Sequence, residues 1–286
     1  MKTYNDIYLS TRRKLRDVAG GAHDLEARLI ISNASGKSRE ELLSHSKFYV
    51  TDPDILEVIE AMVQRRLDGE PVAYLVGEWE FYGLPMYVNR DVLIPRVDTE
   101  VLAEAAIKLM KKRSGHTRLL DLCTGSGCVG LAIAATVPDC RVALADISER
   151  AIAVCKSNMI RNNITRNVTP IILNALESPP ALLGTFDAIV CNPPYIPTGD
   201  LKKLDKSVSK YEPSLALDGG SDGLDFFRAI ASKWSILLNK GGYLLFECGI
   251  GQAQSVIKIL EENGYKEIVT HLDTLGIQRV IQTTVR

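Results

Sequence analysis

The sequence has little of what a metal site or a disulfide framework requires. No two of its six cysteines form a Cys-x-x-Cys pair, and its four histidines are scattered along the chain. Zinc sites are usually built from closely spaced cysteines and histidines. We therefore expect no metal ion, and we expect the cysteines to be reduced, mostly buried thiols. These residues are Cys123, Cys128, Cys140, Cys155, Cys191 and Cys248, and His23, His45, His116 and His271.

The sequence also lacks an excess of charge and a long apolar run. Its 34 Lys and Arg against 35 Asp and Glu give a formal net charge of −1, so no positive field argues for a nucleic acid partner. No stretch reaches the roughly 18 apolar residues of a membrane-spanning helix, and residues 1–15 lack the apolar core of a signal peptide. We expect a cytoplasmic monomer that contacts neither a membrane nor nucleic acid directly.

Residues 1–75 carry helix signals and almost no strand signals. Ser38 stands three residues before Glu41, which is the pattern of a capping box, and Asp52 followed by Pro53 is typical of another helix start. We expect a small all-α domain over residues 1–75 that packs against another protein.

A short β-rich stretch follows this domain. Residues 79–95, WEFYGLPMYVNRDVLIP, alternate between apolar and polar side chains. Alternation on both sides of a turn predicts a β-hairpin. We expect a hairpin linker over residues 76–96, with its turn at Asn89–Asp91.

From residue 117 the chain alternates between strand and helix patterns. This alternation predicts a mostly parallel sheet covered by helices on both faces, and the short turn DTLG before the last strand predicts an antiparallel edge. The fold class is therefore α/β, with a Rossmann-like seven-stranded sheet in a catalytic domain over residues 97–286. We expect strands over residues 118–122, 141–147, 168–173, 186–191, 242–248, 266–272 and 278–285, and helices over 129–137, 149–160, 223–238 and 251–263.

A glycine-rich turn joins the first expected strand of this sheet to its helix. Gly125, Gly127 and Gly130 match the pattern GxGxxG, and Asp146 ends the next strand about 20 residues further on. Glycines let the backbone approach a ligand, and an acid at that place can accept from a ribose hydroxyl. These residues predict a dinucleotide or S-adenosylmethionine. Asp121 favours the latter, because a carboxylate repels a pyrophosphate and attracts the cofactor's ammonium group.

Two consecutive prolines follow the fourth expected strand, in CNPPYIP. Proline has no N–H and a fixed φ, and Pro193 pushes Asn192 toward an extended conformation. The resulting stiff turn presents the Asn192 side chain and nearby carbonyls as acceptors, and Tyr195 can stack on a planar group. We expect Asn192, Pro193, Pro194 and Tyr195 to form a cradle for a planar amino or amide nitrogen beside the cofactor.

The turn DLCTGSG followed by NPPY resembles class I S-adenosylmethionine-dependent methyltransferases that act on planar nitrogens. These include N6-adenine DNA enzymes and protein glutamine N5 enzymes. Three further segments, GEPVAYLVGEWEFYGLPMYVNRDVLIPRVDTE, YEPSLALDGGSDGLDFFRAI and ECGIGQ, are similar to the bacterial release factor glutamine N5-methyltransferases (HemK/PrmC type) over nearly the whole length. The NPPY motif alone is less specific than this combination.

This resemblance implies a substrate, a cofactor and a set of site residues. The substrate is the glutamine of the GGQ motif in class 1 peptide chain release factors, and the helical domain helps to bind the factor. S-adenosylmethionine is the methyl donor and leaves as S-adenosylhomocysteine. Asn192 touches cofactor and substrate, and Asn192, Pro193, Pro194 and Tyr195 form the glutamine site. The implied cofactor residues are Asp121, Cys123, Thr124, Gly125, Ser126, Gly127, the ribose-binding Asp146, and Ala175 and Leu176 near the adenine.

Other functions remain open on the sequence. A glutamine methyltransferase of a large-subunit ribosomal protein would use the same cradle. An N6-adenine DNA methyltransferase would need to grip phosphates, and no basic target-recognition segment is present. GxGxxG alone also fits an NAD-dependent dehydrogenase. Residues 196–223 form a long segment with little regular pattern, which is either functional or merely solvated, and Glu247 ends the fifth strand with no chemistry assigned.

Overall fold

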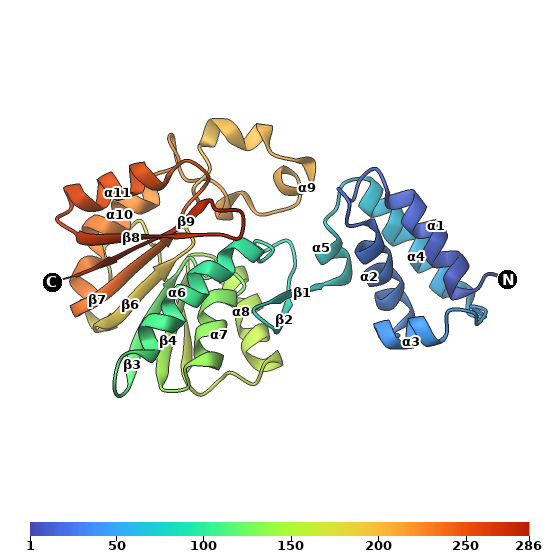
Figure 1. Cartoon of the computed structure of the whole chain (residues 1–286), viewed down its shortest axis with the longest axis horizontal. Helices are drawn as coiled ribbons and strands as arrows, with labels where there is room; N and C mark the ends of the chain where they lie inside the picture. The colour runs from blue at the N-terminus through green and yellow to red at the C-terminus, as the bar shows by residue number, and fades with distance from the viewer. Residues whose placement is uncertain (286) are drawn as a thin grey trace. The chain divides into compact units, whose positions relative to one another are not determined.

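The computed structural model of the chain describes residues 1–285, which form two compact units (Figure 1). One unit contains Met1–Glu78 together with Asp205–Tyr211, and the other contains Trp79–Leu204 and the chain from Glu212 onward. The inclusion of Asp205–Tyr211 in the first unit was not predicted from the sequence. The functional division into residues 1–75, 76–96 and 97–286 stays a prediction.

The first unit is helical. Both predicted helix starts are present: Ser38 accepts from the Glu41 backbone N–H at 3.2 Å while Glu41 accepts from that of Ser38 at 2.7 Å, and the Asp52 side chain caps the helix that begins at Pro53. Apolar side chains such as Ile30 fill the space between the helices. The helices are α1 (Tyr4–Leu15), α2 (His23–Ser35), α3 (Arg39–Ser44), α4 (Pro53–Leu67), α5 (Val72–Val76) and α9 (Lys206–Ser209).

Polar contacts add to this apolar packing. Arg66 forms an ion pair with Glu26 at 2.7 Å, and both side chains are nearly buried. The buried Tyr211 donates its hydroxyl proton to the Asp68 carbonyl at 3.4 Å, which fastens the end of the segment Asp205–Tyr211 to the helical unit. Most of this unit's stability nevertheless comes from its apolar core, because ion pairs contribute little beyond their desolvation cost.

The expected hairpin forms, but its turn lies elsewhere. Strands β1 (Glu78–Phe81) and β2 (Leu84–Tyr87) pair with each other, and the turn consists of Tyr82 and Gly83, with φ of 51° and 76°. A turn does form at Asn89–Asp91, where the Val92 N–H donates to the Asn89 carbonyl at 3.2 Å, but it follows β2 and is not the turn of the hairpin. A type I′ hairpin turn needs left-handed backbone at both central positions, which Gly83 adopts readily. Asn89 instead accepts from the Asp91 N–H through its side chain and from the Val92 N–H through its carbonyl, outside the two strands.

The second unit contains the predicted seven-stranded sheet, with order β5-β4-β3-β6-β7-β9-β8. Strand β9 is antiparallel to both of its neighbours, as the sequence predicted, and the other pairs are parallel. The predicted edge position of this last strand was wrong, because β9 lies between β7 and β8 and β8 forms the edge. The order reverses direction between β3 and β6, and ligand sites of open α/β sheets lie at such a switch point. The strands are β3 (Thr117–Leu122), β4 (Cys140–Asp146), β5 (Val168–Ile172), β6 (Phe186–Cys191), β7 (Leu238–Glu247), β8 (Lys266–Leu272) and β9 (Gln278–Thr284).

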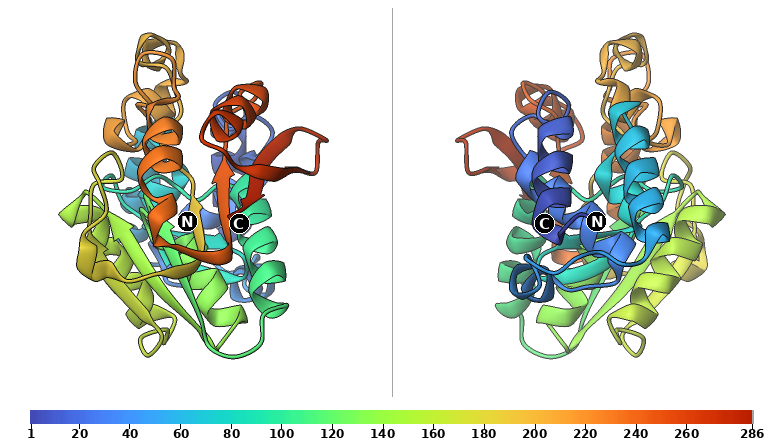
Figure 2. Two further views of the ribbon diagram at one scale, coloured as in Figure 1. Left: turned by 90° about the vertical axis from the view of Figure 1, so that its left-hand side faces the viewer. Right: turned by 90° about the vertical axis from the view of Figure 1, so that its right-hand side faces the viewer.

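Helices cover both faces of this sheet (Figures 1 and 2). Helices α6 (Glu100–Lys111), α7 (Cys128–Thr136) and α8 (Glu149–Arg161) lie on one face, and α10 (Asp225–Lys233) and α11 (Ala253–Glu262) on the other. The helix predicted over residues 223–238 is shorter, because Leu238 already belongs to β7 and pairs with Phe186. An apolar run that suits both a helix and a buried strand cannot be divided by periodicity alone.

The long segment between β6 and α10 is ordered by its own hydrogen bonds. It contains short helices, η3 (Thr198–Lys203), α9 and η4 (Ser214–Ala216). The Ile196 N–H donates to the Leu217 carbonyl at 3.0 Å, and the Gly219 N–H donates back to the Ile196 carbonyl at 2.9 Å. These bonds join the beginning of the segment, just after β6, to its end, just before α10. The remaining short helices are η1 (Val97–Thr99), η2 (Ala181–Leu183) and η5 (Ser235–Leu237).

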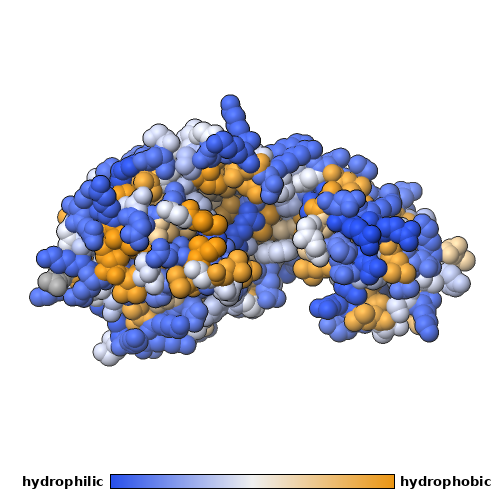
Figure 3. All heavy atoms as spheres, turned by 45° about the horizontal axis from the view of Figure 1, so that its top comes forward, coloured by the Kyte–Doolittle hydropathy of each residue, from blue (hydrophilic) through white to orange (hydrophobic). Residues whose placement is uncertain are grey.

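The surface mixes hydrophilic and apolar side chains. Figure 3 shows hydrophilic residues over most of one face, interrupted by apolar patches. Among residues 1–285, no helix has both the length and the apolar character needed to cross a membrane.

Candidate active site

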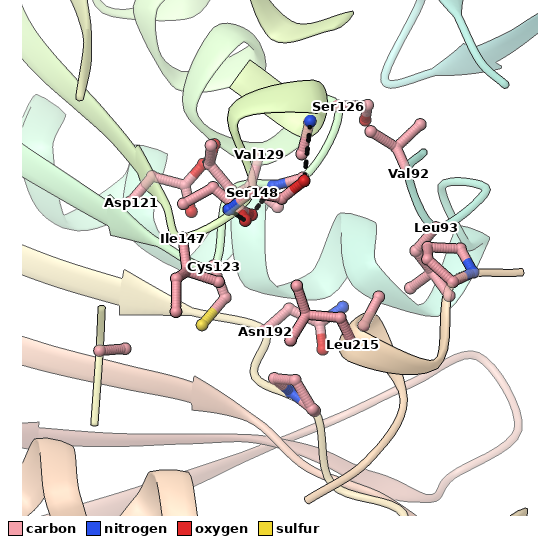
Figure 4. A pocket seen from close by; sticks show the side chains of 18 of the residues that line it. Val92, Leu93, Asp121, Cys123, Ser126, Val129, Ile147, Ser148, Asn192 and Leu215 are labelled. Carbon is pink, nitrogen blue, oxygen red and sulfur yellow. Dashed lines mark hydrogen bonds between the residues drawn. The ribbon is translucent and has the colours of Figure 1, made fainter. Parts of the chain in front are cut away.

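A cavity lies at the carboxyl ends of β3, β4 and β6, entirely within the second unit. It encloses about 1120 Å³ of space that is partly open to solvent. Figure 4 shows Asp121 and Cys123 on the side of the glycine-rich turn, with Asn192, Leu215 and Val92 completing the ring around the hollow. The cavity therefore sits at the switch point in strand order, where open α/β sheets bind their ligands.

The turn after β3 exposes backbone to the cavity. Cys123, Gly125 and Gly127 all have left-handed φ, of 58°, 55° and 86°. The third glycine serves packing, since a Cβ on Gly130 would lie 2.1 Å from the Leu144 side chain. The glycines thus let α7 approach β4 closely and allow the left-handed backbone of the turn beside the cavity.

Asp121 is a buried carboxyl at the base of the turn. Its Oδ2 accepts from the Thr124 hydroxyl at 2.6 Å and from the Gly130 N–H at 2.9 Å. Burial raises the pKa of Asp121 to about 7, against the opposing effect of these two hydrogen bonds. The side chain lines the cavity, and its Oδ1 is available to a cationic ligand group.

Asp146, at the end of β4, is held by backbone donors. Its Oδ2 accepts from the Gly125 N–H and its Oδ1 from the Ser148 N–H, both at 2.9 Å. Burial raises its pKa, and the two backbone hydrogen bonds act in the opposite direction. Each carboxylate oxygen has a second lone pair, so Asp146 can still accept from a ligand hydroxyl at the cavity wall.

Asn192 follows β6 and reaches the cavity from the other side of the switch point. Its Nδ2 donates to the Thr99 hydroxyl at 3.2 Å, so its Oδ1 remains as an acceptor. Pro194 lines the cavity next to it. Two prolines contribute no N–H, so the polar atoms that this turn offers are acceptors.

The backbone of the double-proline turn is supported from behind. The Gln252 side chain donates to the Tyr195 carbonyl at 2.8 Å and accepts from the Gly249 N–H at 2.9 Å. A Cβ on Gly219 would lie 2.8 Å from the Pro194 carbonyl oxygen. Segments that are far apart in sequence therefore hold this turn from two sides, and the position of its acceptors is fixed by packing.

The cavity collects most of the residues that the sequence predicted. Three of the predicted residues do not line it: Gly127, which caps α7, Pro193, and Tyr195, whose pKa burial raises to about 12. The individual roles of all these residues stay predictions. Those that line the cavity are Asp121, Cys123, Thr124, Gly125, Ser126, Asp146, Ala175, Leu176, Asn192 and Pro194.

Sequence reasoning missed several residues that shape the cavity. Fully buried Asn158 accepts from the Tyr87 N–H at 2.6 Å and donates to the Ser126 carbonyl at 2.9 Å, which joins the hairpin to the glycine-rich turn. Arg96 pairs with buried Glu212, just before the cavity residues of η4. The only local signal was a polar residue on the buried face of an otherwise amphipathic helix, at Asn158.

The described residues contain no group of three or more histidine, cysteine or acidic side chains placed to hold a metal ion. The acids at the cavity are separated by the turn and are held by backbone N–H and hydroxyl donors. Carboxylates that already accept such bonds serve polar and cationic groups of an organic ligand.

Comparisons with known proteins agree with this geometry. Residues 97–207 match the family model of the methyltransferase small domain, and residues 7–77 match that of the PrmC N-terminal domain. A release factor glutamine methyltransferase from Geobacter sulfurreducens is 41% identical over 260 residues, which cover 90% of this chain and 88% of the relative. One from Thermodesulfovibrio yellowstonii is 38% identical over 240 residues, which cover 82% and 85%. Among solved structures, a methyltransferase from Pyrococcus furiosus has a TM-score of 0.50 and 18% identity, covering 77% of this chain and 96% of that chain.

The sheet, its helical layers and the cavity at the switch point define a class I methyltransferase. Sequence identity then narrows this class to one group of enzymes. The chain belongs to the release factor glutamine methyltransferase family.

Proposed function

We propose that this enzyme transfers a methyl group from S-adenosylmethionine to the side-chain amide nitrogen of the GGQ glutamine in class 1 peptide chain release factors. Family membership supports the reaction, and the cavity supports a cofactor and a substrate side by side. The observation that carries the proposal is Asn192. Its NH2 group is bound to Thr99, so the oxygen of an acceptor-rich turn is left for a substrate N–H.

The cofactor fits the donors and acceptors of the cavity. When bound, S-adenosylmethionine supplies a methyl group on a positively charged sulfur. Asp121 would pair with its ammonium group, Asp146 would accept from its ribose, and Ala175 with Leu176 would border its adenine. A cation beside the two carboxylates is electrostatically favourable, whereas a pyrophosphate there would be repelled.

The chemical difficulty lies in the substrate, because the lone pair of an amide nitrogen is delocalised into its carbonyl. Acceptors that bind both N–H bonds favour a pyramidal nitrogen whose lone pair points at the methyl group. As the N–CH3 bond forms, the electrons of the broken S–CH3 bond remain on sulfur, and the nitrogen then releases a proton. Alignment of two reactants alone can contribute about 7–11 kcal/mol to such a step.

The direct test is mass spectrometry of a class 1 release factor incubated with the enzyme and S-adenosylmethionine. We expect one added methyl group on the GGQ glutamine. A release factor with glutamate at that position is the matched control and should gain none. An unmodified glutamine after complete incubation would overturn the proposal.

The same assay distinguishes competing substrates. A large-subunit ribosomal protein and double-stranded DNA replace the release factor in otherwise identical reactions, and faster methylation of either one would reassign the substrate. The formal net charge of −1 gives no support to a DNA substrate. Stabilisation by NAD in place of S-adenosylhomocysteine would reassign the cofactor, because a ligand at 100 times its Kd stabilises by about 2.7 kcal/mol.

A further inference from the structure

The side-chain amide of Asn192 has two possible orientations, and the backbone of the turn does not determine which one forms. A carboxamide has nearly the same shape when its oxygen and nitrogen exchange places, but only the oxygen can accept a substrate N–H. With the NH2 group turned toward the cavity, Asn192 would oppose the NH2 group of a glutamine substrate. Something outside the double-proline turn must therefore set the orientation of this side chain.

Thr99 is the direct partner of the Asn192 amide, but by itself it does not decide the orientation. Its hydroxyl accepts from Asn192 Nδ2 at 3.2 Å, and the residue is 2% exposed. A hydroxyl can donate as well as accept, so Thr99 could equally donate to a flipped Asn192 oxygen. The direction of this bond requires a third group that accepts only.

Glu247 supplies such a group. In the parallel pair of β6 and β7, Cys191 is opposite Phe246, so the next residues, Asn192 and Glu247, leave neighbouring strands side by side. Glu247 is 2% exposed, and its Oε2 has no hydrogen-bond partner among the described residues. An unpaired buried carboxylate oxygen is costly to a protein, and it usually marks a function.

The surroundings of Glu247 are consistent with an acceptor. Burial raises its pKa to about 7, while hydrogen bonding from Thr99, the charge of Arg279 and hydrogen bonding from Asn192 lower it. Arg279 also pairs with Asp98 and Asp273, both at 2.9 Å, so its charge is held in place near the carboxyl. The carboxyl group thus lies close enough to Thr99, Asn192 and Arg279 to be stabilised in its ionised form, while the like charge of Asp98 opposes ionisation.

We propose that Thr99 and Glu247 are positioning residues that turn the NH2 group of Asn192 away from the cavity and its oxygen toward the substrate nitrogen. Glu247 accepts the Thr99 proton, Thr99 must then accept from Asn192 Nδ2, and Asn192 Oδ1 is left for the glutamine. This inference rests on the proposed function, since it assigns the acceptor for that substrate. It gives a reaction role to a buried acid that does not line the cavity.

The test uses full-length protein and measures kcat and KM for the release factor. Thr99→Val and Glu247→Gln should each lower kcat about 100-fold, because a misplaced contact in the substrate site can cost that much. In Glu247→Gln, the introduced amide group can donate to the Thr99 hydroxyl. That hydroxyl would then donate to the oxygen of a flipped Asn192 side chain. KM for the release factor and the Kd of S-adenosylhomocysteine should change less than about threefold, since valine keeps the shape of the Thr99 side chain at the cavity wall and Glu247 does not line the cavity.

Two variants separate positioning from packing. Thr99→Ser keeps the hydroxyl and should retain kcat within about threefold, although it removes a buried methyl group. Thr117→Val is the matched control for loss of a buried hydroxyl, because Thr117 is 3% exposed and its Oγ1 has no partner among the described residues. It should leave kcat unchanged. If Thr99→Val itself folds poorly, Glu247→Gln and Thr99→Ser still test the positioning role.

The outcomes are distinguishable. A wild-type enzyme that leaves the release factor unmethylated overturns the proposed function and this inference with it. An active wild-type enzyme whose Glu247→Gln variant keeps a normal kcat overturns only the positioning role. Equal losses in Thr99→Ser and Thr99→Val would also overturn it, because they would trace the defect to packing of the methyl group.

Discussion

The two turns that meet at the cavity have opposite chemistry. The turn after β3 uses left-handed Gly125 and Gly127 and places its N–H groups against the carboxylate of Asp146 and nearby carbonyls. The turn after β6 contains two prolines, which have no N–H, and offers the oxygen of Asn192. Neighbouring strands thus present a carboxylate-lined turn and an acceptor-rich turn, which suits the proposed binding of a cationic cofactor beside a nitrogen that must donate.

The two turns also differ in what holds them. The turn after β3 is held mainly by bonds within the motif and to the adjacent β4, as in the Thr124 N–H donating to the Ala145 carbonyl at 3.0 Å. The turn after β6 depends on distant supports such as Gln252 and Gly219. Substitutions near the second turn should therefore affect catalysis without affecting cofactor binding.

The largest effect should follow from removing the acceptor itself. Asn192→Ala should lower the rate of release factor methylation about 100-fold or more, because an electrostatic contact fixed in advance is lost at the reacting nitrogen. Single-turnover kinetics measure the rate, and calorimetry measures the Kd of S-adenosylhomocysteine. That Kd should stay within about threefold if the two turns act separately. Near-normal turnover would contradict the role assigned to this turn.

A smaller effect should follow from disturbing only the backbone of that turn. A Cβ on Gly219 would lie 2.8 Å from both the Pro194 carbonyl oxygen and the Tyr195 Cα. Gly219→Ala should therefore lower kcat about tenfold and cost about 1–3 kcal/mol of unfolding free energy, because the overpacked backbone must shift. Denaturant titration measures the second quantity.

Gly199→Ala is the matched control for this substitution. Its Cβ would meet nothing within 4 Å, and neither Gly199 nor Gly219 has a left-handed φ. We expect kcat and stability to remain at wild-type levels or stability to rise slightly. If both variants lose activity equally, the loss comes from the flexibility of the whole segment and not from its contact with the turn.

The smallest effect concerns pH and the cofactor side. Burial raises the pKa of Asp121 to about 7, so below that pH the carboxyl is protonated in the free enzyme. An ammonium group pairs with the carboxylate only, so the affinity for S-adenosylhomocysteine should increase as pH rises through about 7, by up to about tenfold between about pH 6 and pH 8. Calorimetry at several pH values measures this change.

Asp121→Asn provides the control for the pH effect. It should bind more weakly than wild type at high pH and should lose most of the pH dependence. The effect of pH on the stability of the free enzyme has the opposite sign to its effect on affinity. A buried acid with a raised pKa makes the free enzyme less stable as pH rises from about 4 toward 7. Affinity that is flat with pH in wild type would contradict the pairing of Asp121 with the ammonium group.

The sequence by itself determined the local chemistry of this protein. The alternation of strand and helix patterns gave the mostly parallel sheet and its antiparallel last strand, and the glycines and prolines defined two turns of opposite character. These features depend on φ preferences and on N–H groups that are present or missing within a few residues. Local physics of this kind is readable without coordinates.

Only the tertiary structure decided which distant residues support these turns. Thr99 stands 93 residues from Asn192 in the chain, yet the two are hydrogen-bonded, and Glu247 reaches the same place through the register of β7. Asn158 and the helical unit's segment Asp205–Tyr211 likewise gave no local signal of their partners. Such contacts arise from packing of elements far apart in sequence, so the orientation of a single side-chain amide is a property of the whole fold.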